Sequence, residues 1–140
     1  MALPIQNGVI TTPYNRACCR TENGKKTPHY WTEHRHKGVD FRAAVGTPIY
    51  AVADGVAVNA NWGKSYGIQI VQRLNDGTFW IYAHLSKSNK TPDAPITKGE
   101  LIGYTGNTGN SSAPHLHCER RNNIRWSAGK DLDPAEVLNA

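Results

Sequence analysis

Short apolar runs separated by turn-forming residues are the feature that most limits what this chain can fold into. Residues 49–53 and 56–58 flank Asp54-Gly55, and residues 66–73 and 78–85 flank Asn75-Asp-Gly77. Asp-Gly sequences between apolar runs favour the tight turns of β-hairpins. The 13 glycines and 8 prolines fit many short strands joined by turns. The sequence therefore predicts a mainly β protein with an antiparallel β-sheet core and little helix.

The remaining segments complete one domain, residues 1–140, because this length suits a single core. Residues 8–14 read as an edge strand ended by Pro13, and residues 40–45 and 101–104 as further strands. Residues 15–31 form an inserted, exposed basic loop in this interpretation. Residues 131–139 are the candidate for a short C-terminal helix, with Asp133 as N-cap and Pro134 at the first helical position.

Charge and hydropathy narrow the classes of partner. The formal net charge of +5 suggests an anionic partner, such as a nucleic acid, a membrane surface or an acidic cell-wall polymer. The basic residues are dispersed and no nucleic-acid signature stands out, so we expect no nucleic-acid partner. No apolar run approaches the roughly 20 residues that span a bilayer, and the first residues lack a signal-peptide pattern. We expect a monomer without membrane insertion.

The three cysteines do not form a disulfide framework. Cys18 and Cys19 are adjacent, and Cys118 is about a hundred residues further along the chain. A single bridge from one of the pair to Cys118 stays open, but free thiols are the favoured interpretation.

Histidines carry the strongest indication of chemistry. His115 and His117 share one face of any strand that contains them, because successive side chains alternate. One ring can then bind a metal while the other reaches its water. His36, Asp40 and His117 would supply two imidazoles and a carboxylate, the three ligands of an open catalytic zinc site. His115 would then be the general base and His84 a donor to the developing oxyanion.

Each of these residues also has a structural interpretation. The His-x-His pair could be a polar strand face, Asp40 a loop cap and His84 a half-buried, hydrogen-bonded histidine. His34 and His36 form a second His-x-His pair, so spacing alone leaves the choice of ligand between them open.

Four blocks of sequence together resemble the lysostaphin-like zinc endopeptidases that cut peptidoglycan. They are His36-Lys-Gly-Val-Asp40-Phe, Gly46-Thr-Pro-Ile-Tyr-Ala-Val-Ala-Asp-Gly55, Tyr82-Ala-His84-Leu-Ser, and Gly103-Tyr-Thr-Gly-Asn-Thr-Gly-Asn-Ser-Ser-Ala-Pro-His115-Leu-His117. The resemblance covers about residues 30–137 and implies that family's fold, a sheet with a groove walled by loops.

The resemblance also implies roles for single residues. It places one Zn²⁺ per chain on His36, Asp40 and His117, prefers His36 to His34, and makes His84 and His115 catalytic. His29 and His34 then become loop residues near the groove. Tyr30, Trp31, Trp62 and Tyr66 are candidates to line the groove, as is Trp80, although some of these aromatic residues could be core. Cys118 stands where the family usually has an aromatic residue, and strand alternation turns it toward the core rather than the metal.

The implied function is zinc-dependent hydrolysis of peptide cross-links in bacterial peptidoglycan through an activated water. The competing interpretation is a non-catalytic wall-binding or amidase-activating module of the same fold. A third, a structural zinc domain, would prefer four closed ligands. The setting implied is a phage lysin, with a bacteriocin-like enzyme or a secreted or excised domain as the alternative. Glycine bridges and D-alanyl cross-links to diaminopimelate or lysine both remain candidate substrates, and the target species is open.

Overall fold

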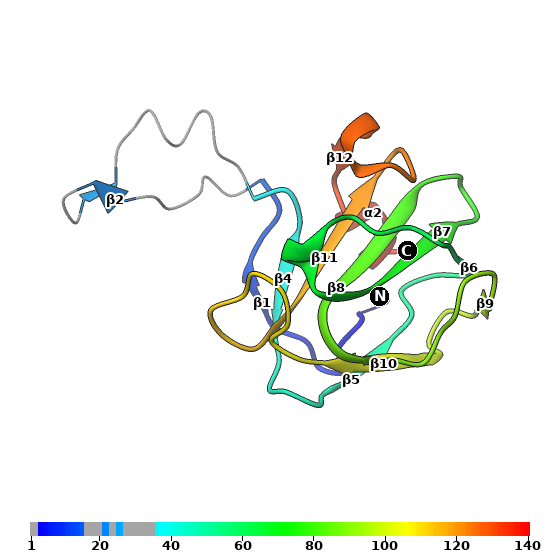
Figure 1. Cartoon of the computed structure of the whole chain (residues 1–140), viewed down its shortest axis with the longest axis horizontal. Helices are drawn as coiled ribbons and strands as arrows, with labels where there is room; N and C mark the ends of the chain where they lie inside the picture. The colour runs from blue at the N-terminus through cyan, green and yellow to red at the C-terminus, as the bar shows by residue number, and fades with distance from the viewer. Residues whose placement is uncertain (1–2, 16–20, 23–24, 27–35) are drawn as a thin grey trace.

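Ten strands form one antiparallel sheet in the part of the chain that the computed structural model describes, residues 3–15, 21–22, 25–26 and 36–140 (Figure 1). Along the sheet the order is β1-β4-β11-β8-β7-β6-β9, with β12 beside β11 and β10 joining β8 to β5. The strands of this sheet are β1 (Ile10–Thr12), β4 (Val39–Arg42), β5 (Pro48–Tyr50), β6 (Gly55–Ala57), β7 (Ile68–Leu74), β8 (Phe79–Ser88), β9 (Pro95–Ile96), β10 (Leu101–Thr105), β11 (His115–Arg121) and β12 (Asp131–Leu132).

Helix is scarce among the described residues. The three helical segments are η1 (Lys64–Tyr66), η2 (Trp126–Ala128) and α2 (Ala135–Leu138). A separate two-stranded hairpin pairs β2 (Thr21–Glu22) with β3 (Lys25–Lys26). The expectation of a mainly antiparallel β fold is therefore confirmed.

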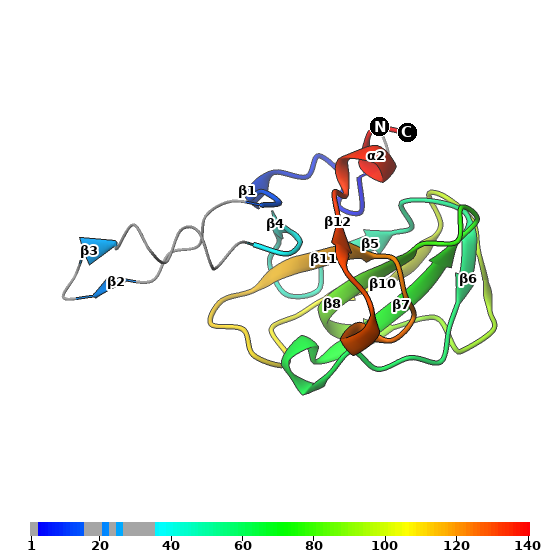
Figure 2. The ribbon, with the colours of Figure 1, turned by 90° about the horizontal axis from the view of Figure 1, so that it is seen from above.

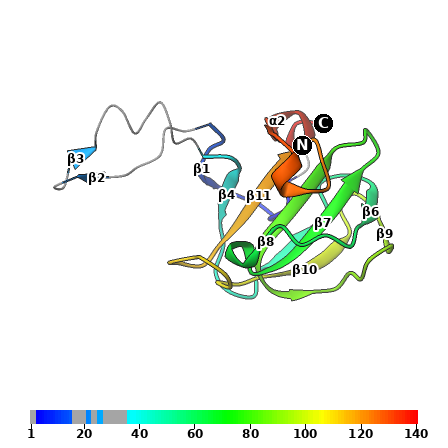
Figure 3. The same ribbon diagram turned by 45° about the horizontal axis from the view of Figure 1, so that its top comes forward.

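The two faces of the central strands bury different clusters. Strands β4, β11, β8 and β7 lie side by side (Figure 3). One face carries Phe41, Leu116, Cys118 and Tyr82, all fully buried, and is covered by β5, β10 and α2. Figure 2 shows α2 on one side of β11 and β8 and η1 on the other. That second face has a smaller cluster of Trp62, Val71, Ile81 and Ala83. Cys118 lies in the core, as strand alternation predicts, and its thiol is free.

The hairpin expected at Asp54-Gly55 is wrong, whereas the one at residues 75–77 is confirmed. Strand β5 pairs with β10, while β6 pairs with β7 and β9, so β5 and β6 are not partners. A Cβ on Gly55 would lie 2.0 Å from the carbonyl oxygen of Arg73. Gly55 therefore lets β6 and β7 approach closely. In the sequence alone, an Asp-Gly pair at such a contact cannot be told from an Asp-Gly pair in a turn. Gly77, by contrast, has φ +87° in the turn between β7 and β8.

The C-terminal helix is shorter than predicted. Residues 131 and 132 pair with Arg121 and Arg120 as β12, so α2 begins only at Ala135. The helix N-cap position is Pro134, although the Asp133 side chain still accepts a hydrogen bond from the Ala135 N–H at 2.9 Å. Residues 131 and 132 satisfy their backbone hydrogen bonds by pairing with β11, so they form a strand and not the first turn of the helix. Within the described residues, no helix is long and apolar enough to cross a membrane.

Candidate active site

Three side chains that could hold a metal ion gather where β4 and β11 pair. Asp40 and His117 are directly opposite each other, and Asp40 Oδ1 lies 2.6 Å from His117 Nδ1. His36, four residues before Asp40, places Nε2 3.3 Å from Asp40 Oδ2. One candidate ligand atom from each residue lies within 4.8 Å of the other two.

Strand alternation explains why these groups face one way. Val39 and Phe41 point into the core, so Asp40 between them must point to the opposite face. On β11 the buried Leu116 and Cys118 alternate with His115 and His117. The polar residues of β4 and β11 therefore meet on the face that carries the smaller apolar cluster.

His84 reaches this face through an irregularity in β8. Ile68 pairs with Leu85 and Ile70 pairs with Tyr82, so β8 has one more residue than β7 across this interval. His84 sits in this bulge with φ +63°, a backbone conformation that is uncommon for a residue with a side chain. Beyond the bulge, β8 leaves β11 and pairs with β10. The bulge places the His84 ring 4.9 Å from that of His115, centroid to centroid.

Backbone carbonyls set the tautomers of three histidines, because a carbonyl oxygen can only accept. Nδ1–H of His84 donates to Thr108 O at 2.7 Å, and Nδ1–H of His115 donates to Ala113 O at 2.8 Å. His36 donates from Nδ1 to Pro13 O at 3.2 Å. Each neutral ring then keeps its lone pair on Nε2. In His115 this nitrogen lies 3.7 Å from Asp40 Oδ1.

The charges of the cluster are strongly coupled. Burial lowers the pKa of His117, but hydrogen bonds to Asp40 and Glu119 outweigh it and raise the pKa to about 9 in the metal-free protein. Burial raises the pKa of Asp40, yet the hydrogen bonds and positive charges of His117 and His36 hold it well below its usual range. Burial lowers the pKa of His84, which favours its neutral ring.

Glu119 is a site residue that the sequence reasoning missed. Its carboxylate accepts a hydrogen bond from His117 Nε2 at 2.8 Å, and its side chain is only 3% exposed. The available signal was strand alternation, because Glu119 is two residues beyond His117 on the same strand face. Tyr66, Ser65 and Asn110 complete a hollow of about 200 Å³ with His84, His117 and Glu119.

The predicted groove residues have different positions. Tyr66 borders this hollow, and its hydroxyl donates to Glu119 Oε2 at 2.5 Å. Trp62 is 5% exposed, packs in the smaller apolar cluster and donates from Nε1 to Ile124 O at 2.9 Å. Trp80 is fully buried in the main core, as the alternative interpretation allowed. Tyr30, Trp31, His29, His34, Cys18 and Cys19 lie outside the described residues, as does most of the loop 15–31.

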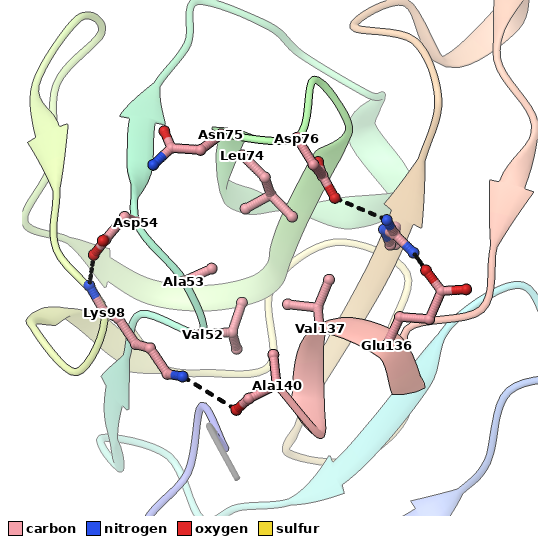
Figure 4. Close-up of a pocket in the computed structure, with 11 residues that line it drawn as sticks. Val52, Ala53, Asp54, Leu74, Asn75, Asp76, Lys98, Glu136, Val137 and Ala140 are labelled. Atoms are coloured by element: carbon pink, nitrogen blue, oxygen red, sulfur yellow. Dashed lines mark hydrogen bonds and ion pairs between the residues drawn. The ribbon is translucent and has the colours of Figure 1, made fainter.

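Another hollow, of about 340 Å³, lies between α2 and the turn that joins β7 and β8 (Figure 4). Val52, Leu74 and Val137 form its apolar wall, and the ion pairs of Asp76 and Glu136 with Arg120 close one side. No described histidine borders it. The described histidines lie instead at the site where β4 and β11 pair.

The donor set suits zinc. Two imidazole nitrogens and one carboxylate oxygen match the three protein ligands of catalytic zinc sites, which leave a fourth position for water. The Nδ1 hydrogen bond of His36 leaves Nε2 for a metal, and the Nε2 contact of His117 with Glu119 leaves Nδ1 for it. His84 and His115 lie beside the three candidate ligands, within reach of a reacting group.

Comparisons with known proteins give the same picture. The profile of peptidase family M23 matches residues 34–134. A glycyl-glycine endopeptidase of Staphylococcus capitis is 46% identical over 111 residues, covering 75% of this chain and 29% of that protein. A DD-carboxypeptidase/endopeptidase of Neisseria meningitidis is 38% identical over 109 residues, covering 78% of this chain and 24% of that protein. The chain thus spans between a fifth and a third of the length of these relatives.

The fold agrees as well. The crystallised catalytic domain of lysostaphin from Staphylococcus simulans superimposes with a TM-score of 0.76 at 34% identity, covering 96% of this chain and 94% of that domain. The matched residues include all three candidate ligands and both additional histidines. The expected resemblance is confirmed, and the chain belongs to peptidase family M23, with a lysostaphin-like catalytic fold.

Proposed function

We propose that this chain is a zinc-dependent endopeptidase that hydrolyses peptide cross-links of bacterial peptidoglycan. The observation that carries the proposal is the grouping of His36, Asp40 and His117 beside His84 and His115. A closed structural site would surround its metal with four ligands, whereas this cluster joins three candidate ligands to two further imidazoles.

The metal would be held by His36 Nε2, His117 Nδ1 and the Asp40 carboxylate. A zinc ion bound there supplies Lewis acidity, which lowers the pKa of water and polarises a carbonyl group. His115 takes a proton from the attacking water on Nε2, since its Nδ1–H is held by Ala113. The same nitrogen then returns the proton to the leaving amine.

His84 stabilises the negative charge that develops on the scissile carbonyl oxygen. Its Nδ1–H is occupied by Thr108, so Nε2 is the nitrogen that faces a reacting group. Burial favours the neutral ring, so Nε2 donates only after the ring takes up a proton, and the negative charge that develops on the oxyanion favours that protonation. The hollow beside His84, His117 and Tyr66 would receive an extended peptide next to these groups.

Peptidoglycan is the proposed substrate because the names of two relatives match the two kinds of cross-link that the sequence leaves open. One relative is a glycyl-glycine endopeptidase and another is a DD-carboxypeptidase/endopeptidase. The net charge of +5 would favour adhesion to an anionic wall. Action on the bacterial cell wall after release, as by a phage lysin or an antimicrobial enzyme, or as a secreted or excised domain, is the setting that we propose.

The test is cleavage of purified sacculi from several wall types. Turbidity loss and released amino groups would be measured for the protein with a chelator and after zinc is added back. We expect cleavage that the chelator stops and zinc restores, on walls with either glycine bridges or D-alanyl cross-links, and the susceptible wall identifies the bond. Binding of one zinc without cleavage of any wall would favour the non-catalytic wall-binding module.

A further inference from the structure

The ring of His117 has a carboxylate on each side. Asp40 Oδ1 lies 2.6 Å from Nδ1, and Glu119 Oε2 lies 2.8 Å from Nε2. A metal on Nδ1 requires the proton of the neutral ring to be on Nε2, where Glu119 can accept it. The Glu119 contact therefore selects the tautomer that leaves the required lone pair.

Other side chains hold Glu119 in place. Tyr66 donates its hydroxyl to Glu119 Oε2, and Arg121 NH1 donates to Glu119 Oε1 at 3.3 Å. Trp126 Nε1 donates to the Tyr66 oxygen at 3.0 Å, so the hydrogen-bond chain extends to the η2 segment. Arg121 is itself fixed by the carbonyl oxygens of Trp126 and Gly129 at 3.2 and 2.9 Å.

Burial protects the hydrogen bonds of Glu119 and Arg121 from exchange with water. Glu119 and Arg121 are 2% and 4% exposed, so their charged groups have few water molecules with which to exchange these contacts. His117, Glu119 and Arg121 occupy alternate positions on one face of β11. One strand therefore carries the candidate ligand, its carboxylate partner and the cation that balances that carboxylate.

We propose that Glu119 is a positioning residue that fixes the orientation and tautomer of His117 for metal binding, and that Tyr66 holds the Glu119 carboxylate in place. The inference rests on the metal site of the proposed function. The Pro13 carbonyl orients His36 in the same way: it accepts a hydrogen bond from Nδ1, the nitrogen that the metal would not use. A backbone carbonyl is hard to remove by substitution, whereas the Glu119 side chain is open to test.

The experiment measures zinc affinity by competition with a chromophoric chelator for Glu119→Ala, Glu119→Gln and Tyr66→Phe. We expect Glu119→Ala to weaken zinc binding by about 10- to 100-fold, the usual cost of losing an outer partner of a metal-bound histidine. Glu119→Gln retains an oxygen that can accept from His117 and should lose less. Tyr66→Phe removes one hydrogen bond to the Glu119 carboxylate and should lose about two- to tenfold. The control Glu136→Gln removes a carboxylate that pairs with Arg120, which alternation places on the opposite face of β11, and it should bind zinc normally.

A second readout separates positioning from folding. Long-range ¹H–¹⁵N spectra of the zinc-loaded proteins report which His117 nitrogen carries hydrogen. Wild type should show hydrogen on Nε2 and metal on Nδ1, and Glu119→Ala should show a weakened or mixed pattern. Thermal melts of the metal-free proteins give the folded fraction, and Tyr66→Phe, which keeps the ring, preserves a test if Glu119→Ala does not fold.

Unchanged zinc affinity and an unchanged His117 spectrum in folded Glu119→Ala would overturn the inference. An affinity loss that only follows the unfolded fraction would overturn it too. These outcomes are independent of catalysis: a protein that binds zinc through Glu119-oriented His117 but cuts no wall would contradict the proposed function and leave the positioning role supported.

Discussion

Asp40 and His117 are cross-strand partners, and their side chains meet at 2.6 Å between Oδ1 and Nδ1. A carboxylate 77 positions earlier in the chain is thus brought beside an imidazole by the register of β4 and β11. The same two groups are candidate ligands of one cation, so a bound metal would compete with this contact. The consequences can be measured.

Zinc should stabilise the fold through this pair. A ligand that binds the folded state alone, at a free concentration 100 times its dissociation constant, adds about 2.7 kcal/mol to the free energy of unfolding. We expect zinc to raise the melting temperature of wild type and to have no effect on Asp40→Ala, which lacks one candidate ligand. Differential scanning calorimetry with and without zinc makes the comparison. An equal rise in both proteins would place the stabilising metal elsewhere.

His115→Ala should separate catalysis from metal binding. Loss of a general base typically reduces a rate by about 10²- to 10⁴-fold, while zinc affinity should remain near that of wild type because His115 is not among the three grouped ligands. Cleavage of sacculi and zinc titration would be measured on the same preparation. Ser111→Ala, which removes a hydroxyl 3.2 Å from His115 Nδ1 but leaves the Ala113 carbonyl, serves as a milder comparison. Full activity in His115→Ala would remove this residue from the mechanism.

Thr108→Val should reduce turnover without touching a candidate ligand. The Thr108 hydroxyl donates to Leu85 O at 2.7 Å and accepts from Ile68 N at 3.1 Å, while its carbonyl holds His84. Losing the hydroxyl should let the carbonyl and the His84 ring shift, and we expect kcat to fall about 10-fold, since small misplacements of a catalytic group are costly. Kinetics on a soluble cross-bridge peptide would measure it. Thr97→Val, on an exposed turn, is the matched control, and an equal effect in both would argue against a role in placing His84.

Acid should weaken the turn between β7 and β8 through Asp76. Burial raises the pKa of Asp76, but hydrogen bonds from Thr78 and Arg120 together outweigh it and lower the pKa below its usual value. A pKa lowered by folding stabilises the protein above the unfolded value of about 3.9, and this contribution is lost as the pH falls through the folded value.

Asp76→Asn should therefore be destabilised at pH 7 by only about 0.2–1 kcal/mol, because the Asp76 side chain is 49% exposed and solvent screens its pair with Arg120. The difference from wild type should shrink near pH 3. Urea denaturation at both pH values tests this. Glu136→Gln, which removes the other carboxylate partner of Arg120 (Figure 4), should have a smaller effect because Glu136 is 76% exposed. A constant difference across pH would show that the effect is not electrostatic.

The local sequence was enough for the features that depend on near neighbours. Alternation predicted that Cys118 points into the core, and the turn at residues 75–77 was confirmed because Gly77 adopts the positive φ that such a turn needs. The grouping of His36, Asp40 and His117 also agrees with the expectation, while their binding of a metal stays a prediction.

Pairing between distant segments decided the rest. Gly55 follows an aspartate, as a turn glycine often does. Its missing Cβ instead makes room for the Arg73 carbonyl of the neighbouring strand β7. His84 should point to the core face by simple alternation, and only the bulge against β7 turns it toward His115.

The sequence by itself therefore determined the β class, the residues with metal-binding chemistry and the family that they resemble, because these depend on residue type and short spacing. The tertiary structure alone decided which strands pair, which way His84 points and that the Tyr66 hydroxyl reaches the Glu119 carboxylate beside His117. Those outcomes depend on the register between strands far apart in the chain, which no local pattern encodes.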